Sequence, residues 1–247
     1  MDNFGEYIFK VRTYECGKSG EATLASICNY LQEAASLNAE ELKFSKSNFE
    51  ASGENISWVL TRLKVKMSRY PKWEDEIKIV TFPRGGRRIT AWRDFEITAA
   101  NGDIIGRATS EWMLIDLATR KIVPIPEEVF KCANTVREPV LGLEPFTAKL
   151  RFPACEPEAK YVFRAQNSHI DLNGHVNNVH YVEWLMEPFK ASQASEFEIV
   201  FRSETLAGEE VVLETAQCAP REAIHRVCSL AGADHAIAKI TLPELSR

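Results

Sequence analysis

Three polar residues of different chemistry stand at alternate positions in one short segment of the chain. Residues 171–178 read Asp-Leu-Asn-Gly-His-Val-Asn-Asn, which puts a carboxylate (Asp171), an amide (Asn173) and an imidazole (His175) into a glycine-containing turn. Such groups transfer protons and stabilise developing negative charge. The apolar, aromatic residues that follow predict a helix, so the turn also faces the unpaired N–H groups of a helix start. This turn is therefore the candidate reactive site.

A purely structural interpretation of the same residues is open. Asp and Asn before a helix are most often N-caps, so Asp171 or Asn173 could serve only to start the helix. Asn177 and Asn178 fit a helix start better than a reactive site. The remaining histidines are His169, His180, His225 and His235. They lack partners at ligand spacing, and neither a metal site nor a cofactor is predicted.

Composition is that of an ordinary globular protein. The chain has 247 residues, of which 45% are hydrophobic and 26% charged, enough for one large core or two small ones. A net charge of −5 argues against a nucleic-acid-binding protein. No apolar run is long enough to span a membrane, and the first residues do not form a secretory signal. Six widely spaced cysteines without a C-x-x-C pair disfavour disulfides and indicate a cytoplasmic location.

The elements that must position the turn recur in the same order in both halves of the chain. In the first half, strand-like residues 7–14 precede helical spacing over 21–38. Strand patterns follow at 63–67, 77–81, 89–98 and 104–116, with the hairpin signal Asn101-Gly102 between the last two. In the second half, strand-like residues 161–166 precede the turn and a helix at about 176–188. The later strands are predicted at 197–202, 211–217, 224–230 and 236–242.

This repeated order indicates an internal duplication. One helix for about five strands favours an α+β fold of two tandem hotdog units, each a long helix wrapped by a curved antiparallel sheet, with the sheets joined edge to edge. We expect one unit in residues 1–135, a proline-marked linker in 136–157 and the second unit in 158–247. Residues 15–20, before the first helix, lack the Asp-x-Asn-x-His pattern. One reactive centre per chain is therefore expected, walled by the first unit.

The turn resembles the signature of acyl-acyl carrier protein thioesterases, the plant and bacterial double-hotdog enzymes that end fatty-acid synthesis. Residues 58–62, 107–112 and 124–129 are similar to family segments in the same order, so the resemblance covers nearly the whole chain. His-Val-Asn-Asn alone is shared with hotdog thioesterases generally. The Asn two residues before the histidine and the duplicated length favour the carrier-protein branch. The resemblance implies hydrolysis of fatty acyl-acyl carrier protein to a free fatty acid.

The resemblance also implies a functional carboxylate at the end of the strand after the second helix, where this sequence has Glu204. Some members carry a cysteine directly after it, but here Thr205 disfavours a cysteine mechanism. We expect Glu204 to activate water and Asn173 to help place it. His175 would donate a hydrogen bond to the thioester or the leaving thiolate, and Asp171 would orient the cluster. A strand-end glutamate is otherwise a solvated charge, and which carboxylate is the base stays open.

A fatty acyl chain needs an apolar tunnel, expected between the first helix and its curved sheet, with Trp58 among the candidate contacts. The acyl carrier protein is acidic, so its docking surface should be basic. Arg84, Arg87 and Arg88 form a compact basic loop, although a polar hairpin turn is an equal alternative. Further basic residues of this half are Lys64, Lys66, Arg69 and Lys72.

Other functions are not excluded by the residues. An acyl-coenzyme A thioesterase would use the same site. A hotdog dehydratase takes its histidine and carboxylate from opposing units, whereas Asp171 and His175 lie in one turn. The intact polar cluster counts against a non-catalytic acyl-binding module. The absence of G-x-S-x-G and of glycine-rich phosphate loops disfavours a serine hydrolase or a nucleotide-binding protein. A homodimer is compatible with the sequence.

Overall fold

The computed structural model of the chain describes residues 2–142, 146, 149–189 and 193–244. Its helices are α1 (Leu24–Glu41), α2 (Lys46–Ala51), α3 (Glu127–Lys131) and α4 (Asn178–Met186), with 3-10 turns at Thr13–Glu15, Asn167–His169 and Glu187–Phe189. The strands are β1 (Gly5–Lys10), β2 (Ile56–Met67), β3 (Glu76–Arg87), β4 (Thr90–Ala99), β5 (Ile104–Asp116), β6 (Ile122–Val123), β7 (Ala159–Arg164), β8 (Glu196–Phe201), β9 (Glu210–Ala219), β10 (Glu222–Ser229) and β11 (Asp234–Thr241).

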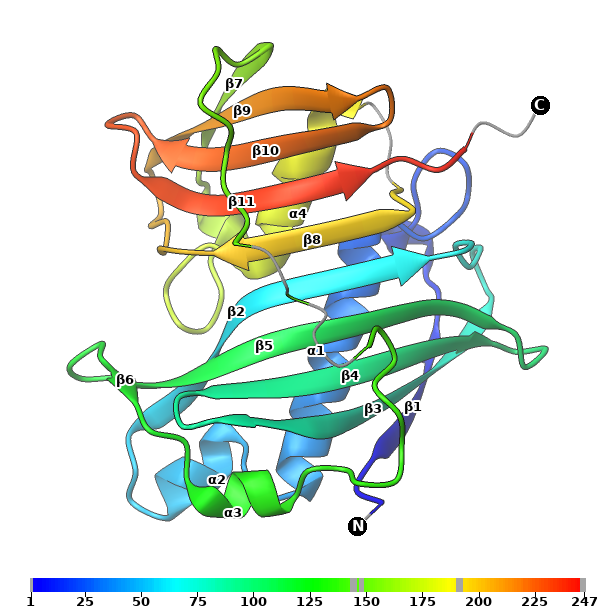
Figure 1. Cartoon of the computed structure of the whole chain (residues 1–247), viewed down its shortest axis with the longest axis vertical. Coiled ribbons are helices and arrows are strands. Elements are labelled where there is room, and N and C mark those ends of the chain that lie inside the picture. The colour runs from blue at the N-terminus through cyan, green and yellow to red at the C-terminus, as the bar shows by residue number, and fades with distance from the viewer. Residues whose placement is uncertain (1, 143–145, 147–148, 190–192, 245–247) are drawn as a thin grey trace.

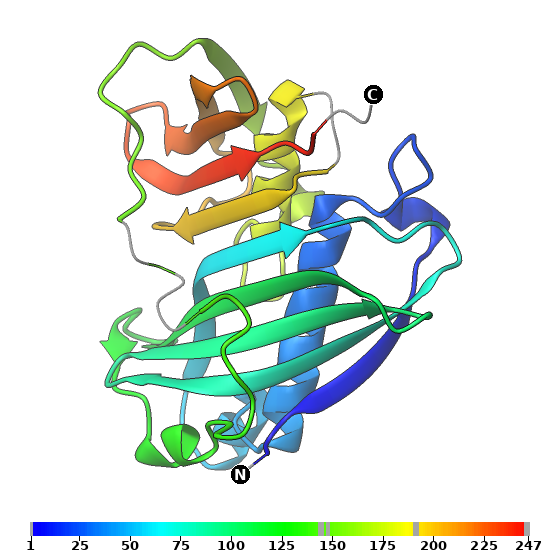
Figure 2. The same ribbon diagram turned by 45° about the vertical axis from the view of Figure 1, so that its right-hand side comes forward.

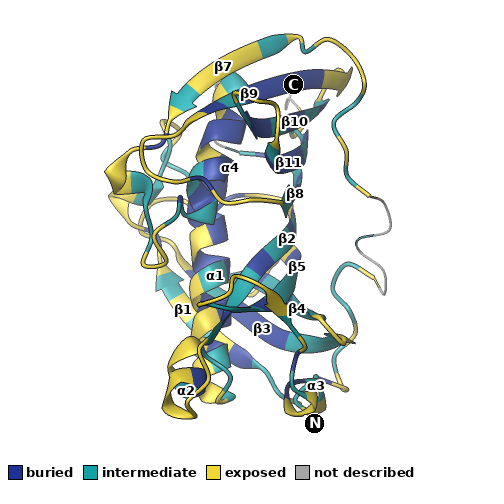
Figure 3. Cartoon of the chain, turned by 90° about the vertical axis from the view of Figure 1, so that its left-hand side faces the viewer, coloured by how far each residue is buried: buried dark blue, intermediate teal, exposed yellow. Residues whose placement is uncertain are grey.

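Over the described ranges the eleven strands form one antiparallel sheet in the order β1-β3-β4-β5-β2-β8-β11-β10-β9-β7, with β6 paired to β5 (Figure 1). The two long helices lie on the same side of this sheet, α1 behind the first half and α4 behind the second (Figure 2). Seen from the side, α4 continues the line of α1 along the sheet (Figure 3). The sheet therefore wraps both helices.

Both halves have the same topology. In each half the strand before the helix pairs with the second strand after it, β1 with β3 and β7 with β9. The remaining strands then follow as β4-β5-β2 and β10-β11-β8. The predicted tandem hotdog architecture, with sheets joined edge to edge, is thus confirmed.

The two halves join where β2 pairs with β8. Basic side chains of β2 there bind acidic side chains of β8: Arg62 Nε donates to Glu198 Oε1 at 2.9 Å, and Lys64 Nζ lies 3.1 Å from Glu196 Oε1. Lys66 also binds Glu196, at 3.1 Å. The alternation predicted for residues 63–67 is confirmed, because the intervening apolar side chains are buried. Lys64 and Lys66, however, are engaged by β8 and do not extend a free basic surface.

One hydrophobic core runs through both units. The buried face of α1 carries Leu24, Ile27 and Leu31, and that of α4 carries Val182 and Leu185. Both helices begin slightly later than the sequence predicts because polar side chains cap them. Thr23 Oγ1 accepts the N–H of Ser26 at 3.0 Å, and Asn177 Oδ1 accepts the N–H of Val179 at 3.0 Å.

Other boundaries also differ from the sequence predictions. β2 and β3 are longer than expected, and β1 ends at Lys10 because residues 13–15 turn into a 3-10 helix. The short helices α2 and α3 were not predicted; they cover a small separate core of Phe49, Leu114, Ile125 and Val129. The described residues of the linker form neither helix nor strand. No helix in the described ranges is both long and apolar enough to cross a membrane.

Candidate functional site

A cleft of about 550 Å³ opens where the two units meet. Its walls come from α1, β2 and β5 of the first unit and from the turn before α4 and the segment after β8 of the second. The structure brings together in this cleft all four residues predicted to be reactive, Asp171, Asn173, His175 and Glu204, and places Trp58 in the same wall. Side chains of both units therefore line one cavity.

The turn before α4 is held by hydrogen bonds of the backbone N–H and carbonyl of Asp171. Its N–H donates to the carbonyl of His175 at 2.8 Å, and its carbonyl accepts the N–H of Gly174 at 3.0 Å. Gly174 has φ +84°, a conformation that glycine adopts without strain. Asp171 Oδ1 accepts the N–H of Asn173 at 2.8 Å, which holds the amide beside the carboxylate. The N-cap of α4 is Asn177, so the alternative in which Asp171 or Asn173 caps this helix is wrong.

Glu204 enters the cleft from the segment after β8. Its Oε2 lies 2.9 Å from His175 Nε2, and its Oε1 forms an ion pair with Arg120 of the first unit. Burial and the positive charge of Arg120 lower the pKa of His175 below its ordinary value, and Asp171 opposes them. The imidazole is therefore neutral near pH 7. The arrangement sets a carboxylate, a neutral imidazole and an amide around one open space.

Thr205, directly after Glu204, does not face the cleft. It is completely buried, and its hydroxyl accepts a hydrogen bond from Tyr181 Oη at 2.7 Å and lies 2.8 Å from His235 Nδ1. Burial raises the pKa of Tyr181 to about 12, so this phenol stays protonated. These contacts give Thr205 and His235 structural roles. A nucleophile at this position would have no access to a substrate in the cleft.

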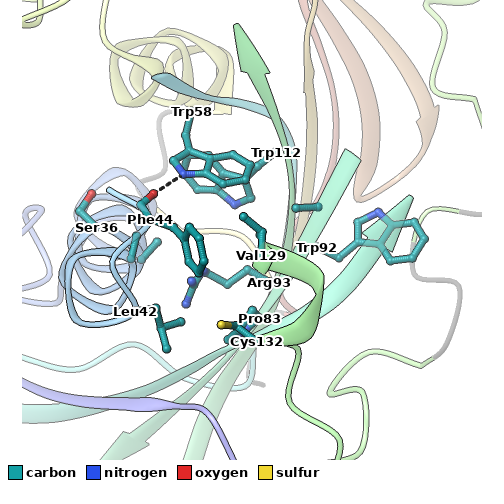
Figure 4. Close-up of a pocket in the computed structure, with 13 residues that line it drawn as sticks. Ser36, Leu42, Phe44, Trp58, Pro83, Trp92, Arg93, Trp112, Val129 and Cys132 are labelled. Carbon is teal, nitrogen blue, oxygen red and sulfur yellow. Dashed lines mark hydrogen bonds between the residues drawn. The ribbon is translucent and has the colours of Figure 1, made fainter. Parts of the chain in front are cut away.

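A second, apolar cavity of about 100 Å³ adjoins the cleft inside the first unit (Figure 4). The two cavities share Ser36, Trp58 and Trp112 as wall residues. Trp58 is held by a hydrogen bond from its indole N–H to the carbonyl of Phe44 at 2.7 Å. In Figure 4, Trp58 and Trp112 are drawn toward one end, and Leu42, Pro83 and Cys132 toward the other. The space lies between α1 and the curved sheet, where we expect a tunnel from the sequence.

One charged side chain, Arg93, stands in the wall of this apolar cavity. It donates to Asn38 Oδ1 at 2.7 Å and to Thr81 Oγ1 at 3.2 Å, which ties β4 to α1. Burial lowers the pKa of Arg93 to about 10, so the guanidinium stays charged at neutral pH.

The basic residues expected to dock a partner differ in their exposure. Arg84 is part of β3 rather than of a loop, and its side chain is only 8% exposed. It lies 3.9 Å from the buried carboxylate of Asp94 and donates to the carbonyl of Gly142. The expected compact basic loop is thus wrong for Arg84, because strand β3 extends farther than predicted. Arg87 and Arg88 are exposed at the turn between β3 and β4.

Sequence reasoning missed Arg120. It lies in the turn between β5 and β6, which Asp116 fixes by accepting the N–H groups of Ala118 at 3.1 Å and Thr119 at 2.6 Å. Arg120 has φ +58°, a left-handed conformation that costs a non-glycine residue on the order of 1 kcal/mol. No motif marks this arginine, and 84 positions separate it from Glu204. The only signal is the aspartate that starts a hairpin turn.

The corner before α1 repeats the backbone of the turn before α4. Gly17 N–H donates to the carbonyl of Glu21 at 2.9 Å, and Gly20 N–H donates to the carbonyl of Gly17 at 3.0 Å. Gly20 has φ +78°, as Gly174 has φ +84°. The bridge between Cys16 and Ala22 repeats the one that closes the second turn. The duplication is therefore visible in individual hydrogen bonds.

The side chains of the first corner differ from those of the second. The positions of Asp171, Asn173, His175 and Glu204 correspond to Gly17, Ser19, Glu21 and Tyr70. In the described part of the chain the acid–amide–imidazole turn therefore occurs once. No cluster of three or more His, Cys, Asp or Glu side chains that could hold a metal ion is found among the described residues.

Curated relatives of the chain include thioesterases from plants. The oleoyl-acyl carrier protein thioesterase 2, chloroplastic, of Arabidopsis thaliana is 32% identical over 191 residues, which cover 72% of this chain and 52% of that protein. The oleoyl-acyl carrier protein thioesterase, chloroplastic, of Coriandrum sativum is 33% identical over 198 residues, with the same coverage of 72% and 52%. The chain thus spans about half the length of the curated relatives it matches.

Solved structures share the fold over nearly the full length. The 12:0-ACP thioesterase from Umbellularia californica aligns with a TM-score of 0.83 at 23% identity, covering 96% of both chains. An acyl-ACP thioesterase from Bacteroides thetaiotaomicron aligns with a TM-score of 0.82 at 22% identity, covering 97% of both. The models of the acyl-ACP thioesterase N-terminal and C-terminal domains match residues 4–133 and 155–241. With both domain models matched in order, the chain belongs to the acyl-ACP thioesterase family.

Proposed function

We propose that the chain hydrolyses the thioester of a fatty acyl-acyl carrier protein and releases a free fatty acid, which ends fatty-acid synthesis. The observation that carries the proposal is the convergence of Asp171, Asn173, His175 and Glu204 on one cleft that adjoins an apolar cavity. A thioester has a polar reacting centre and an apolar chain, and the two adjoining spaces match these two parts.

Glu204 is the better placed of the two carboxylates to accept the proton of the attacking water. Both oxygens of Asp171 are bound by Asn173, whereas Glu204 directly contacts the imidazole of His175 and keeps a second lone pair on each oxygen for water. Water attacks the carbonyl carbon while its proton passes to Glu204. The C–S bond then breaks, the proton on Glu204 passes to the leaving sulfur, and His175 donates a hydrogen bond to that sulfur as the thiol and the free fatty acid form.

The start of α4 supplies the positive potential that the intermediate needs. Asn178, the first residue of this helix, lines the cleft, so the positive end of the helix dipole lies at the cleft wall. The amide of Asn173 adds a neutral donor held by Asp171. Together they stabilise the oxyanion without a net positive charge at the carbonyl.

The first unit, residues 1–135, takes the acyl chain in this proposal. The chain passes between Trp58 and Trp112, which belong to the walls of both cavities, and continues along α1. Each methylene removed from water there contributes about 0.8 kcal/mol to binding. The second unit, residues 158–247, carries the reactive turn.

Arg87 and Arg88 are the exposed part of the proposed docking surface for the acidic carrier protein. The carbonyl of Arg88 accepts the N–H of Ile125 at 2.8 Å, which fixes their turn beside the segment after β6. Charge reversal of both residues is expected to raise KM at low salt and to leave kcat unchanged. Lys10→Glu with Lys18→Glu is the control with the same change in net charge. Equal KM values for both pairs would remove the docking role.

The direct test compares one acyl group presented on carrier protein and on coenzyme A, with free fatty acid and free thiol as readouts. Faster release from the carrier protein supports the proposal. An equal or faster rate on coenzyme A would instead identify an acyl-coenzyme A thioesterase. Binding without release would identify a non-catalytic module. The cytoplasmic location and the homodimer stay predictions.

A further inference from the structure

The carboxylate of Glu204 is held between residues from the two different units. Arg120, on the turn between β5 and β6 of the first unit, binds Oε1, and His175 of the second unit contacts Oε2. All three side chains line the cleft. The constellation around Glu204 is therefore completed across the junction of the units.

The backbone of Arg120 provides an independent observation. Its N–H donates to the carbonyl of Asp116 at 2.8 Å, and Asp116 N–H donates to the carbonyl of Lys121 at 2.9 Å. In a hairpin of this shape the residue with positive φ is ordinarily glycine. The chain has an arginine there, at φ +58°, and so carries strain that glycine would remove. Lys43 and Glu74 also have positive φ and lie outside the cleft, so the strain at Arg120 bears on function only together with its contact with Glu204.

The other charged groups of the cleft have partners that set them apart from Arg120. The titratable and cationic side chains that line it are Arg120, Asp171, His175, Tyr181, Arg202 and Glu204. The hydroxyl of Tyr181 is engaged by the buried Thr205. Arg202 comes from the end of β8 and donates to the carbonyl of Leu150 at 3.0 Å. Asp171 is turned toward the amide of Asn173. Arg120 is thus the cation that contacts the carboxylate beside the imidazole.

We infer that Arg120 is a positioning residue of the hydrolytic site, which holds the Glu204 carboxylate against His175 from the opposite unit. The inference rests on the proposed function. An exposed ion pair alone contributes little to stability. This pair matters through geometry, because a carboxylate fixed at both oxygens offers its remaining lone pairs to water in one orientation, and small errors in such placement lower rates strongly.

The decisive variant is Arg120→Gly, because it removes the guanidinium and relieves the backbone strain at once. We expect an equal or higher Tm together with a loss in kcat of about 10- to 100-fold and little change in KM. Arg120→Lys keeps a cation without the planar fork and should recover part of the loss. Lys121→Gln, next to it on the same turn but outside the cleft, is the matched control and should behave like the original chain.

Two further measurements separate positioning from a general structural effect. In an E204Q background, Arg120→Gly should cause no additional loss, because its partner is already gone. Since Arg120 is one cause of the lowered pKa of His175, its removal should also move the acid limb of the kcat/KM profile toward higher pH.

The outcomes distinguish this inference from the function on which it rests. Unchanged kcat in Arg120→Gly, or an equal loss in the E204Q background, overturns the role of Arg120 while the hydrolytic site stands. Full activity of E204Q itself overturns the proposed mechanism, whatever Arg120 does.

Discussion

His175 Nε2 lies 2.9 Å from Glu204 Oε2, although one residue precedes α4 and the other follows β8. The residues that follow them, Val176 and Thr205, are joined by a backbone hydrogen bond, in which Val176 N–H donates to the carbonyl of Thr205 at 2.9 Å. This bond explains why His175 and Glu204 lie close together. The reactive turn and the strand tip are therefore fixed to each other by main chain. The side chains of His175 and Glu204 therefore extend from neighbouring backbone segments and meet in the cleft.

Replacing Glu204 by Gln keeps its size and removes its ability to accept a proton. We expect kcat to fall by about 10²- to 10⁴-fold, the range for loss of a general base, with Tm little changed. Steady-state hydrolysis of acyl-carrier substrate and thermal unfolding measure the two effects. Glu210→Gln, an exposed carboxylate at the start of β9, is the control. Equal rates for both variants would contradict the assignment of Glu204 as the base.

Asp171 binds Asn173 in this structure, and a double-mutant cycle tests whether Asp171 acts through this amide. In Asp171→Asn, one amide would face another, so we expect Asn173 to turn and kcat to fall about 10- to 100-fold. Asn173→Ala should cause a similar loss. The double variant should be no worse than Asn173→Ala alone. Fully multiplicative losses would show instead that Asp171 acts on the substrate independently.

The apolar cavity predicts how acyl-chain preference can be altered without changing the chemistry. Ala39 of α1 lines this cavity but not the cleft. A leucine there would occupy space, so we expect the released fatty acids to become shorter while kcat on short chains is kept. Leu37→Phe, which adds bulk at an exposed position of the same helix, is the control. An unchanged product profile would mean that the acyl chain lies elsewhere.

We expect the buried His225 to lower the stability of the folded chain as the pH falls. It is completely buried in the second unit, and burial lowers its pKa to about 4 from 6.5. As pH falls through this window the unfolded chain binds a proton that the folded chain does not, so the free energy of unfolding decreases. The full shift corresponds to roughly 3 kcal/mol. Urea unfolding of the chain and of His225→Leu between about pH 7 and 4.5 measures it.

The leucine variant should show a shallower pH dependence over the same range. Burial also lowers the pKa of His235 and of His169, so part of the slope will remain. Parallel curves for the two proteins would show that His225 is not the group responsible.

Patterns of apolar residues were enough to predict the two units and their order. Alternation in 63–67 and helical spacing in 21–38 depend on which side chains face the core, and the core is what the fold buries. The ends of elements were less predictable. Residues 84–87 contain two glycines and look like a loop, yet the pairing of β3 with β4 continues through them. Cross-strand pairing over such residues leaves no local pattern.

The turn at residues 171–175 could be found from the sequence, whereas Arg120 could not. Asp171, Asn173 and His175 lie in one short segment, so their spacing carries the signal. Arg120 reaches Glu204 only because β5 runs beside β2 and β2 beside β8. The contact depends on sheet order and on a left-handed turn residue, neither of which residue types reveal. Similarly, Lys64 and Lys66 look like free cations in the sequence, but in the structure both bind a glutamate of β8.

The unequal corners of the two units determine the stoichiometry of the chain. Two identical corners would offer two equivalent centres, whose occupancy could be cooperative. With Gly17, Ser19 and Glu21 in place of the acid, amide and imidazole, we expect one centre in the described part of the polypeptide. Titration with a non-hydrolysable acyl analogue should then saturate at one equivalent per chain, and the initial rate of a single chain should rise hyperbolically with substrate concentration.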